Sequence, residues 1–231
     1  MKYRLKKVAV LGSGVMGSGI ACHLANIGME VLMLDIVPST LEGAQLKDPK
    51  LRNSIVNGAL QNAVKSKPAS LYKKSFVSRI STGNFEDDFE KIKDADWIIE
   101  VVVERLDIKQ QILQKVDSIR KVNSLVSSNT SSIPIHLLAE KCSDDFKAHF
   151  CGTHFFNPPR YLRLLEVIPT PSTLMDVTDF FMEFGKVGLG KQTVLCKDTP
   201  AFIGNRIGVM SGSEMTILTE KYNFRVEEVD A

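Results

Sequence analysis

Hydrophobic residues occur along this chain in short runs that alternate with longer segments of helical periodicity. Residues 7–11 (KVAVL) form an apolar run that predicts a buried strand. Residues 17–28 repeat apolar side chains at helical spacing and stop at a glycine, and residues 30–35 form a second apolar run. This order of strand, helix and strand predicts a βαβ unit with parallel strands.

The same alternation continues to about residue 198. The polar, lysine-rich segment 36–75 carries Pro38, Pro49 and Pro68, so we expect two short helices there that project from the sheet. Further strands are expected at 76–81, 97–103, 124–129, 148–156, 163–168 and 192–198, and further helices at 85–95, 107–120, 133–142 and 173–185. The pattern predicts an α/β fold with a Rossmann-type, doubly wound, mostly parallel sheet, to which the region after Leu162 could add antiparallel strands.

A domain boundary is expected at "KDTPAFIGNR". Pro200 should end the last strand and open a helix over residues 201–221. One helix and a short tail cannot enclose a core of their own. We therefore expect residues 1–199 to form the nucleotide-binding domain and residues 200–231 to be the truncated beginning of a helical C-terminal domain.

Composition excludes several classes of function. The net charge is +2, with 29 basic and 27 acidic residues, so no basic field argues for nucleic acid. No apolar run approaches the ~18 residues that a membrane span needs. The cysteines are scattered without CxxC spacing, so we expect free thiols in a reducing cytoplasm and no metal site; they are Cys22, Cys142, Cys151 and Cys196.

A dinucleotide-binding motif follows the first strand. Gly12, Gly14 and Gly17 form GxGxxG, which gives a tight turn, room for a pyrophosphate and close helix–strand packing. The second strand ends at Asp35, whose carboxylate can bind a ribose 2′-hydroxyl and repel a 2′-phosphate. Ile36 follows it rather than an arginine, so the sequence predicts NAD as cofactor; the alternative is a glycine-rich turn beside a solvated aspartate.

Two polar stretches follow later strands, where ligands gather in open α/β sheets. Glu104 follows the central strand, and Lys109 lies five residues on; they are either cofactor contacts or a helix-capping Glu and a solvated Lys. The stretch "SSNTSSIP" precedes a predicted helix. It is equally typical of a helix N-cap and of a site that holds a hydroxyl or carbonyl group.

A histidine and a glutamate lie on consecutive predicted strands. His154 ends one strand, Glu166 lies within the next, and the Asn-Pro-Pro break at 157–159 turns the chain between them. If the strands run alongside each other, the carboxylate can orient the imidazole as a base that accepts a proton from an alcohol. The alternative is a core histidine packed among phenylalanines.

Six motifs together resemble a known family, the L-3-hydroxyacyl-CoA dehydrogenases of fatty-acid β-oxidation. They are "GSGVMGSGIA", "EVVVE", "SSNTSS", "THFFNP", "LLEVI" and "KDTPAFIGNR", in the family's order and spacing. The "HFFNPPRYLRLLEVIPTP" form is most similar to bacterial enzymes that fuse this dehydrogenase to an enoyl-CoA hydratase.

The resemblance implies a role for individual residues. His154 matches the catalytic base, Glu166 its partner carboxylate, and Ser131 a hydroxyl that contacts both substrate and cofactor. Asn205 matches an amide that completes the catalytic site. The implied cofactor contacts outside the glycine motif and Asp35 are Glu104, Lys109, Ser131 and Asn157. The implied reaction is oxidation of (S)-3-hydroxyacyl-CoA to 3-oxoacyl-CoA by NAD.

Two positions depart from the family pattern, and two other functions stay open. Arg105 follows Glu104 where asparagine is common, and Gly204 weakens the helix that carries Asn205. The resemblance also implies a homodimer, formed through the C-terminal domain of which this chain covers only the beginning. The alternatives are a dehydrogenase of a free hydroxy acid and a non-catalytic NAD-binding module.

Overall fold

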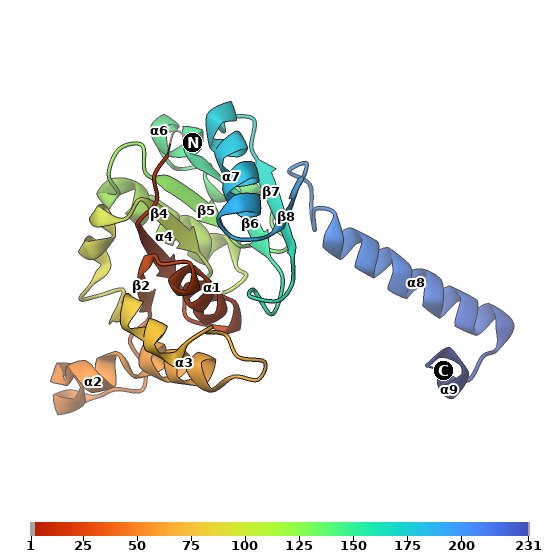
Figure 1. Ribbon diagram of the computed structural model, residues 1–231, viewed down its shortest axis with the longest axis horizontal. Helices are drawn as coiled ribbons and strands as arrows, with labels where there is room; N and C mark the ends of the chain where they lie inside the picture. Colours follow the sequence, from red (N-terminus) through yellow and green to blue (C-terminus); the bar gives the residue numbers. More distant parts are fainter. Residues whose placement is uncertain (1–2, 231) are drawn as a thin grey trace.

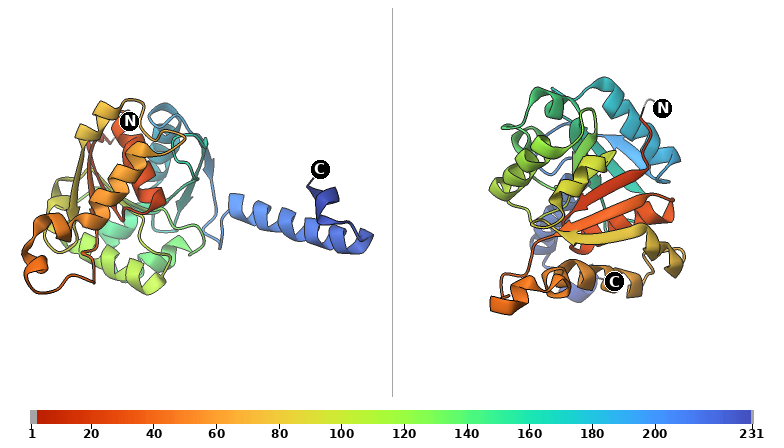
Figure 2. Two further views of the ribbon diagram at one scale, coloured as in Figure 1. Left: turned by 90° about the horizontal axis from the view of Figure 1, so that it is seen from below. Right: turned by 90° about the vertical axis from the view of Figure 1, so that its left-hand side faces the viewer.

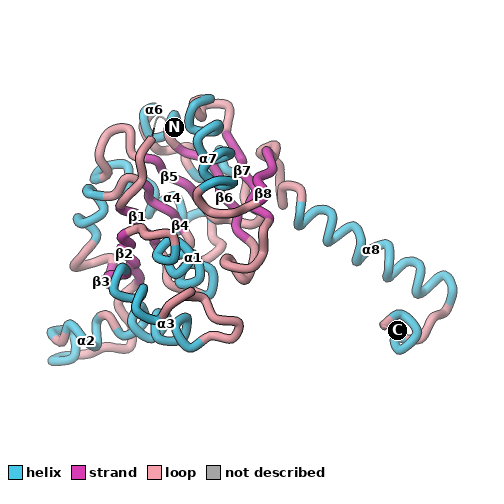
Figure 3. The backbone as a smooth tube through the Cα atoms, in the orientation of Figure 1, coloured by secondary structure: helices cyan, strands magenta, loops and turns pink. Residues whose placement is uncertain are grey.

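The computed structural model describes residues 3–230, which form an eight-stranded sheet with helices on both faces (Figure 1). The strand order is β3-β2-β1-β4-β5-β6-β7-β8, and the strands run through the middle of the body (Figure 3). Their bounds are β1 Lys7–Leu11, β2 Glu30–Asp35, β3 Ile80–Asn84, β4 Trp97–Glu100, β5 Leu125–Ser128, β6 Phe150–Phe155, β7 Leu164–Pro169 and β8 Gln192–Leu195.

The strand directions confirm the expected Rossmann-type sheet. Strands β1 to β6 are mutually parallel, β7 pairs antiparallel with β6, and β8 runs parallel to β7. The strand order reverses between β1 and β4, and ligands of open α/β sheets bind in the crevice beyond the carboxyl ends of the strands at such a point.

Two hydrophobic clusters lie on opposite faces of the sheet, because alternate residues of a strand point to opposite sides. Val8 and Val10 of β1 belong to one cluster, and Ala9 and Leu11 belong to the other. The first face is covered by α1 Val15–Asn26, α3 Ser54–Lys65 and α7 Met175–Val187. The second is covered by α4 Leu106–Ile119, α5 Ile135–Leu138, α6 Asp144–Ala148 and the 3-10 helix η3 Phe89–Asp94, and Figure 2 shows the sheet between the two layers.

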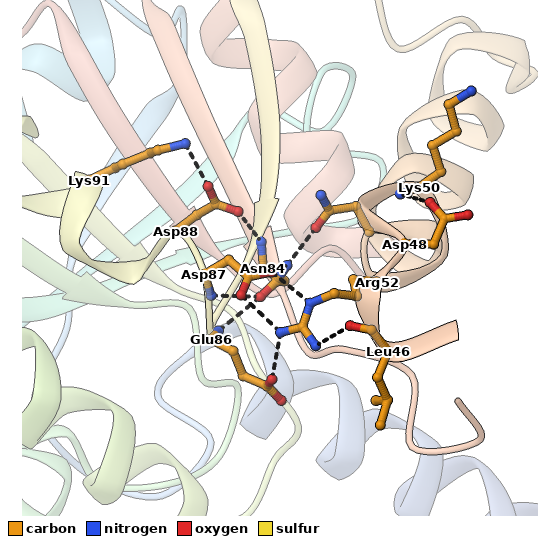
Figure 4. Close-up of polar contacts among 10 residues, drawn as sticks. Leu46, Asp48, Lys50, Arg52, Asn84, Glu86, Asp87, Asp88 and Lys91 are labelled. Atoms are coloured by element: carbon orange, nitrogen blue, oxygen red, sulfur yellow. Dashed lines mark hydrogen bonds and ion pairs between the residues drawn. The ribbon is translucent and has the colours of Figure 1, made fainter. Parts of the chain in front are cut away.

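The segment 36–75 contains more helical structure than the two helices expected. The 3-10 helix η1 Gly43–Lys47 and α2 Pro49–Arg52 precede α3, and the 3-10 helix η2 Lys74–Arg79 begins at its end. Arg52 ties this segment to the end of β3: its guanidinium donates to Asp87 at 2.7 Å and to Glu86 at 2.7 Å (Figure 4). The projecting segment is therefore held at the carboxyl end of β3, the edge strand of the sheet.

Several predicted elements were wrong in extent or kind. Residues 76–79 are the end of η2, and β3 begins only at Ile80. The helix expected at 85–95 is the shorter η3, because the buried Asn84 side chain accepts bonds from the Glu86 and Asp87 amides and holds a turn there. The strand at 97–103 ends at residue 100, and the helix at 133–142 is the four-residue α5.

Pro200 does not open the last helix, contrary to the prediction. Ala201 and Phe202 adopt left-handed backbone angles (φ 60° and 47°), and α8 begins at Gly204 and runs to Tyr222. None of the α8 residues is buried, and the helix projects from the body with the short α9 (Val226–Val229) at its far end (Figures 1 and 2). No helix within residues 3–230 is long and apolar enough to span a membrane.

Candidate active site

The glycine motif forms the turn between β1 and α1, and a side chain would meet different surroundings at each of its three glycines. Gly12 has φ +108°, and a Cβ there would lie 2.5 Å from the Val101 carbonyl oxygen. A Cβ on Gly17 would lie 1.9 Å from the Gly12 carbonyl oxygen. No described atom lies within 4 Å of a Cβ built on Gly14, so open space faces the chain at the start of the helix.

This open space fits a dinucleotide. Gly14 is the N-cap of α1, and among the described residues no side chain caps the helix, so its first N–H groups are available to an anion. On the next strand, Asp35 is half-buried at the carboxyl end of β2, where the expected ribose contact lies. The residues present therefore provide the phosphate cradle and the carboxylate that a dinucleotide needs.

Asp35 also has a structural role that the sequence pattern does not indicate. Its Oδ2 accepts hydrogen bonds from the Ser13 amide (2.7 Å) and the Ser13 hydroxyl (2.5 Å), and its Oδ1 accepts from the Ile36 amide at 2.7 Å. Ser13 is only 1% exposed. The carboxylate thus fixes the glycine turn as well as facing the expected ribose position.

His154 and Glu166 lie directly opposite each other on the antiparallel strands β6 and β7. The distance from His154 Nδ1 to Glu166 Oε2 is 2.7 Å, and both side chains are buried. An ionised carboxylate can only accept, so Nδ1 carries the proton and Nε2 is the nitrogen left for a ligand. This geometry excludes a histidine held only by packing against phenylalanines, although Phe156 (ring centroids 4.5 Å apart) and Phe202 do flank the ring.

The second oxygen of Glu166 is bound by the start of α8. The amides of Ile203 and Gly204 donate to Oε1 at 3.0 and 2.7 Å. Burial on its own would raise the pKa of Glu166, but the bonds from His154, Gly204 and Ile203 outweigh burial and lower it. Glu166 is therefore held as a carboxylate although its side chain is enclosed.

A cleft of about 360 Å³ brings together most of the expected site residues. His154 and Phe156 line it from β6 and the following loop, and Met16 lines it from α1, next to the glycine turn. The predicted site residues that also line it are Glu104, Lys109, Ser131, Asn157 and Asn205. Glu166 lies behind His154, and the glycines and Asp35 lie further along the same edge of the sheet.

The "SSNTSS" stretch binds Glu104 rather than capping a helix. Oε1 of Glu104 accepts from the Thr130 hydroxyl at 2.5 Å and from the amides of Ser131 and Ser132 at 3.0 and 3.2 Å. Burial opposes ionisation, but these bonds and the charge of Lys109 outweigh it and lower the pKa of Glu104 to about 2. Asn205 of α8 donates to the Ser131 carbonyl at 3.2 Å, so the α8 start also reaches this loop.

Lys109 is buried, and its main partner was missed in the sequence. Its Nζ lies 2.7 Å from Oε1 of Glu100 and 3.2 Å from Oε2 of Glu104. Glu100 is 0% exposed and also accepts bonds from the Val102 amide and the Ser128 hydroxyl. A glutamate ending an apolar strand, nine residues before a lysine, was the signal that could have revealed this pair.

A second cleft of about 440 Å³ lies beside the first and shares Asn157 with it. It is enclosed by the N-terminal part of α1, the C-terminal half of α3 and the loop at Pro158 and Pro159. Lys67 and several small polar side chains line it. Within residues 3–230 no cluster of His, Cys, Asp and Glu side chains could hold a metal ion, and the four cysteines are buried and unpaired.

Comparisons with known proteins identify the family of this chain. Residues 7–199 match the family model described as "3-hydroxyacyl-CoA dehydrogenase, NAD binding domain". The chain is 52% identical to a "Probable 3-hydroxyacyl-CoA dehydrogenase" of Bacillus subtilis, over 100% of this chain and 30% of that protein. It is 44% identical to a Rickettsia felis protein named for a fatty acid oxidation complex trifunctional enzyme, over 90% of this chain and 28% of that protein.

A solved structure has a similar fold. The crystal structure of (S)-3-hydroxybutyryl-CoA dehydrogenase from Ralstonia eutropha superposes with a TM-score of 0.76 at 28% identity, over 97% of this chain and 75% of that one. The chain spans less than a third of the length of the two relatives from Bacillus subtilis and Rickettsia felis.

Proposed function

The chain belongs to the family of the 3-hydroxyacyl-CoA dehydrogenase NAD-binding domain, and from this premise we propose that the protein oxidises (S)-3-hydroxyacyl-CoA to 3-oxoacyl-CoA with NAD. The observation that carries the proposal is the 2.7 Å contact between His154 Nδ1 and Glu166 Oε2, in a cleft next to a dinucleotide-binding turn. Family membership supports NAD as the cofactor, and the imidazole paired with a carboxylate supports proton removal from a hydroxyl group.

The glycine turn and the start of α1 would hold the pyrophosphate of NAD, and Asp35 would hold the adenosine ribose. Glu104, Lys109, Ser131 and Asn157 line the cleft where the nicotinamide half would lie. Because Lys109 directs its amine to Glu100 and Glu104, it acts on the cofactor through Glu104. Bound NAD supplies the hydride acceptor.

His154 performs the proton transfer. Its Nε2 accepts the proton of the 3-hydroxyl group while Glu166 stabilises the imidazolium that forms. The substrate oxygen would be positioned by the Ser131 hydroxyl and the Asn205 amide, which reach the same cleft from the β5–α5 loop and from α8. The Phe156 and Phe202 rings pack against the imidazole and would help to hold its orientation.

The second cleft supports a coenzyme A thioester as substrate. It adjoins the catalytic cleft at Asn157 and is lined by Lys67, whose ammonium can bind a phosphate. One wall of this 440 Å³ cleft is the start of α1 at Gly14, where the NAD pyrophosphate would lie, so the coenzyme arm would occupy the opposite side, beside α3 and Lys67. We therefore place the acyl group beside His154 and the coenzyme arm towards α3.

The wider setting is also a proposal. Similarity to a trifunctional enzyme favours a role in fatty-acid β-oxidation and a fusion to an enoyl-CoA hydratase. Residues 1–199 would be the NAD-binding domain, and residues 200–231 would begin a helical domain that forms a homodimer. The exposed apolar side chains of α8, such as Ile207, Val209 and Met210, support such a covered surface.

Oxidation of NADH by acetoacetyl-CoA and by free acetoacetate tests the proposal. We expect turnover with the thioester and at least 100-fold lower kcat/KM with the free acid, equivalent to about 2.7 kcal/mol. Equal rates would favour a dehydrogenase of free hydroxy acids. NADH binding without turnover of either substrate would favour a non-catalytic NAD-binding module.

A further inference from the structure

The catalytic carboxylate has two oxygens with different partners. Oε2 binds His154, and Oε1 accepts from the backbone amides of Ile203 and Gly204. Glu166 is 0% exposed with this segment in place, so an N–H removed without displacing the segment leaves Oε1 with no solvent donor to replace it. An enclosed carboxylate that loses a hydrogen-bond donor becomes more basic.

The two amides belong to a segment with an unusual backbone. Ala201 and Phe202 are both left-handed, which is unfavourable for residues with a side chain. Phe202 is 2% exposed and packs against His154, with ring centroids 5.9 Å apart. This bend turns the chain so that the next two amides point at Glu166.

Gly204 is a glycine because this approach is close. A Cβ there would lie 2.8 Å from Cζ of Phe156 and 3.5 Å from Oε1 of Glu166. A Cβ built on Gly208, one turn later, would have no described atom within 4 Å. A side chain at position 204 would therefore press on the Phe156 ring, which packs against His154.

We infer that the Ile203 and Gly204 amides are positioning groups of the proton-transfer pair, so that the seating of α8 sets how strongly His154 holds its proton. With both amides in place, Glu166 shares its charge among three donors and attracts the Nδ1 proton less. When the amides withdraw, the carboxylate attracts that proton more strongly, and the imidazolium form of His154 is stabilised. The position of α8 is thereby coupled to the chemistry of the NAD-binding domain.

The titratable groups that face Glu166 come from two strands. His154 faces it from β6, and Cys196 faces it from the end of β8. Burial, and then the charge of Glu166, raise the pKa of Cys196 to about 12, so this thiol stays neutral across the working range of pH. From α8 the facing groups are the two backbone amides. A change in the pair on altering α8 therefore reports on these amides.

The test replaces the Gly204 amide with an ester, by incorporating glycolic acid, so that one N–H is removed and no atom is added. The same exchange at Gly208 is the matched control, because it removes one bond of the same helix without touching Glu166. Protonation of His154 is followed by ¹⁵N NMR, with its signal assigned by its loss in His154→Gln. The acid limb of kcat/KM for oxidation of (S)-3-hydroxybutyryl-CoA is measured in parallel.

The Gly204 ester should move the protonation midpoint of His154 and the acid limb upward by about half to one pH unit, and the Gly208 ester should move neither. Gly204→Ala, compared with Gly208→Ala, should give a shift of the same sign. An unmoved His154 midpoint in the folded Gly204 ester overturns the inference. The acid limb of kcat/KM can be measured only if the proposed function is correct, whereas the His154 protonation midpoint measured by NMR does not depend on that function. A shifted midpoint without turnover would therefore refute the function and leave the inference standing.

Discussion

The ammonium of Lys109 lies 2.7 Å from the carboxylate of Glu100, and both side chains are at most 1% exposed. Removal of one partner of a buried ion pair leaves an uncompensated charge, which costs about 3–5 kcal/mol. Lys109→Met should therefore lower the free energy of unfolding by that amount in urea denaturation. Lys115→Met, on an exposed position of the same helix, is the control and should cost less than ~1 kcal/mol.

A double substitution tests whether Lys109 and Glu100 stabilise the protein through their contact with each other. Combining Lys109→Met with Glu100→Gln removes both charges, so part of the stability should return. If the double variant is as unstable as the sum of the two single variants, the two residues do not form the coupled pair described.

The acid stability of the protein should depend on Glu104. Its folded pKa of about 2 lies below the ordinary value of 4.5, so its contribution is present above pH 4.5 and is lost as the pH falls towards 2. The difference in unfolding free energy between wild type and Glu104→Gln should accordingly shrink as the pH is lowered through that window. A difference that stays constant from neutral pH to about pH 3 would contradict the bonds assigned to this carboxylate.

Substitution of Asp35 should affect both cofactor binding and stability. Asp35→Ala removes the expected ribose contact and should weaken NADH binding about tenfold, equivalent to about 1.4 kcal/mol. Because Asp35 also accepts three bonds from Ser13 and Ile36, we expect unfolding to become easier by about 1 kcal/mol. Isothermal titration with NADH and a melting curve measure the two effects. Unchanged NADH affinity would show that Asp35 does not contact the cofactor.

The left-handed backbone at Ala201 predicts a stabilising substitution. Ala201→Gly relieves a strain of about 1–2 kcal/mol in the folded chain. Glycine also makes the unfolded chain more flexible, which opposes folding by up to about 1 kcal/mol, so the free energy of unfolding should rise by about 0.5–1 kcal/mol. Ala59→Gly, in the middle of α3, is the matched control and should lose about 1 kcal/mol. Equal losses in both variants would show that position 201 is not strained.

The sequence predicted the sheet, its glycine turn and the meeting of His154 with Glu166 because each rests on local patterns. Alternating apolar runs identified the strands, and glycine spacing identified the turn at Gly12. The Asn-Pro-Pro break at residues 157–159 allowed His154 and Glu166 to meet, and their direct pairing across β6 and β7 confirms that their strands run side by side.

The features that escaped prediction depend on contacts between distant segments. The Glu100–Lys109 pair forms only when α4 packs beside β4. The left-handed turn at Ala201 and Phe202 precedes the bond from the Ile203 amide to Glu166, a contact between segments 37 residues apart. Pro200 suggested a helix start because proline is common in the first turn of helices. That preference is local, whereas the actual start at Gly204 depends on contacts with Glu166. The short η3 likewise follows from the side chain of Asn84 rather than from apolar spacing.

The most direct measurement of the central claim is kcat for oxidation of (S)-3-hydroxybutyryl-CoA in His154→Ala and Glu166→Gln, with NADH affinity determined on the same samples. General-base catalysis with its oriented partner predicts that kcat falls about 10²–10⁴-fold in each variant while the Kd for NADH stays within about twofold of wild type. Either variant retaining more than about a tenth of the wild-type kcat would contradict the proton-transfer role assigned to the pair.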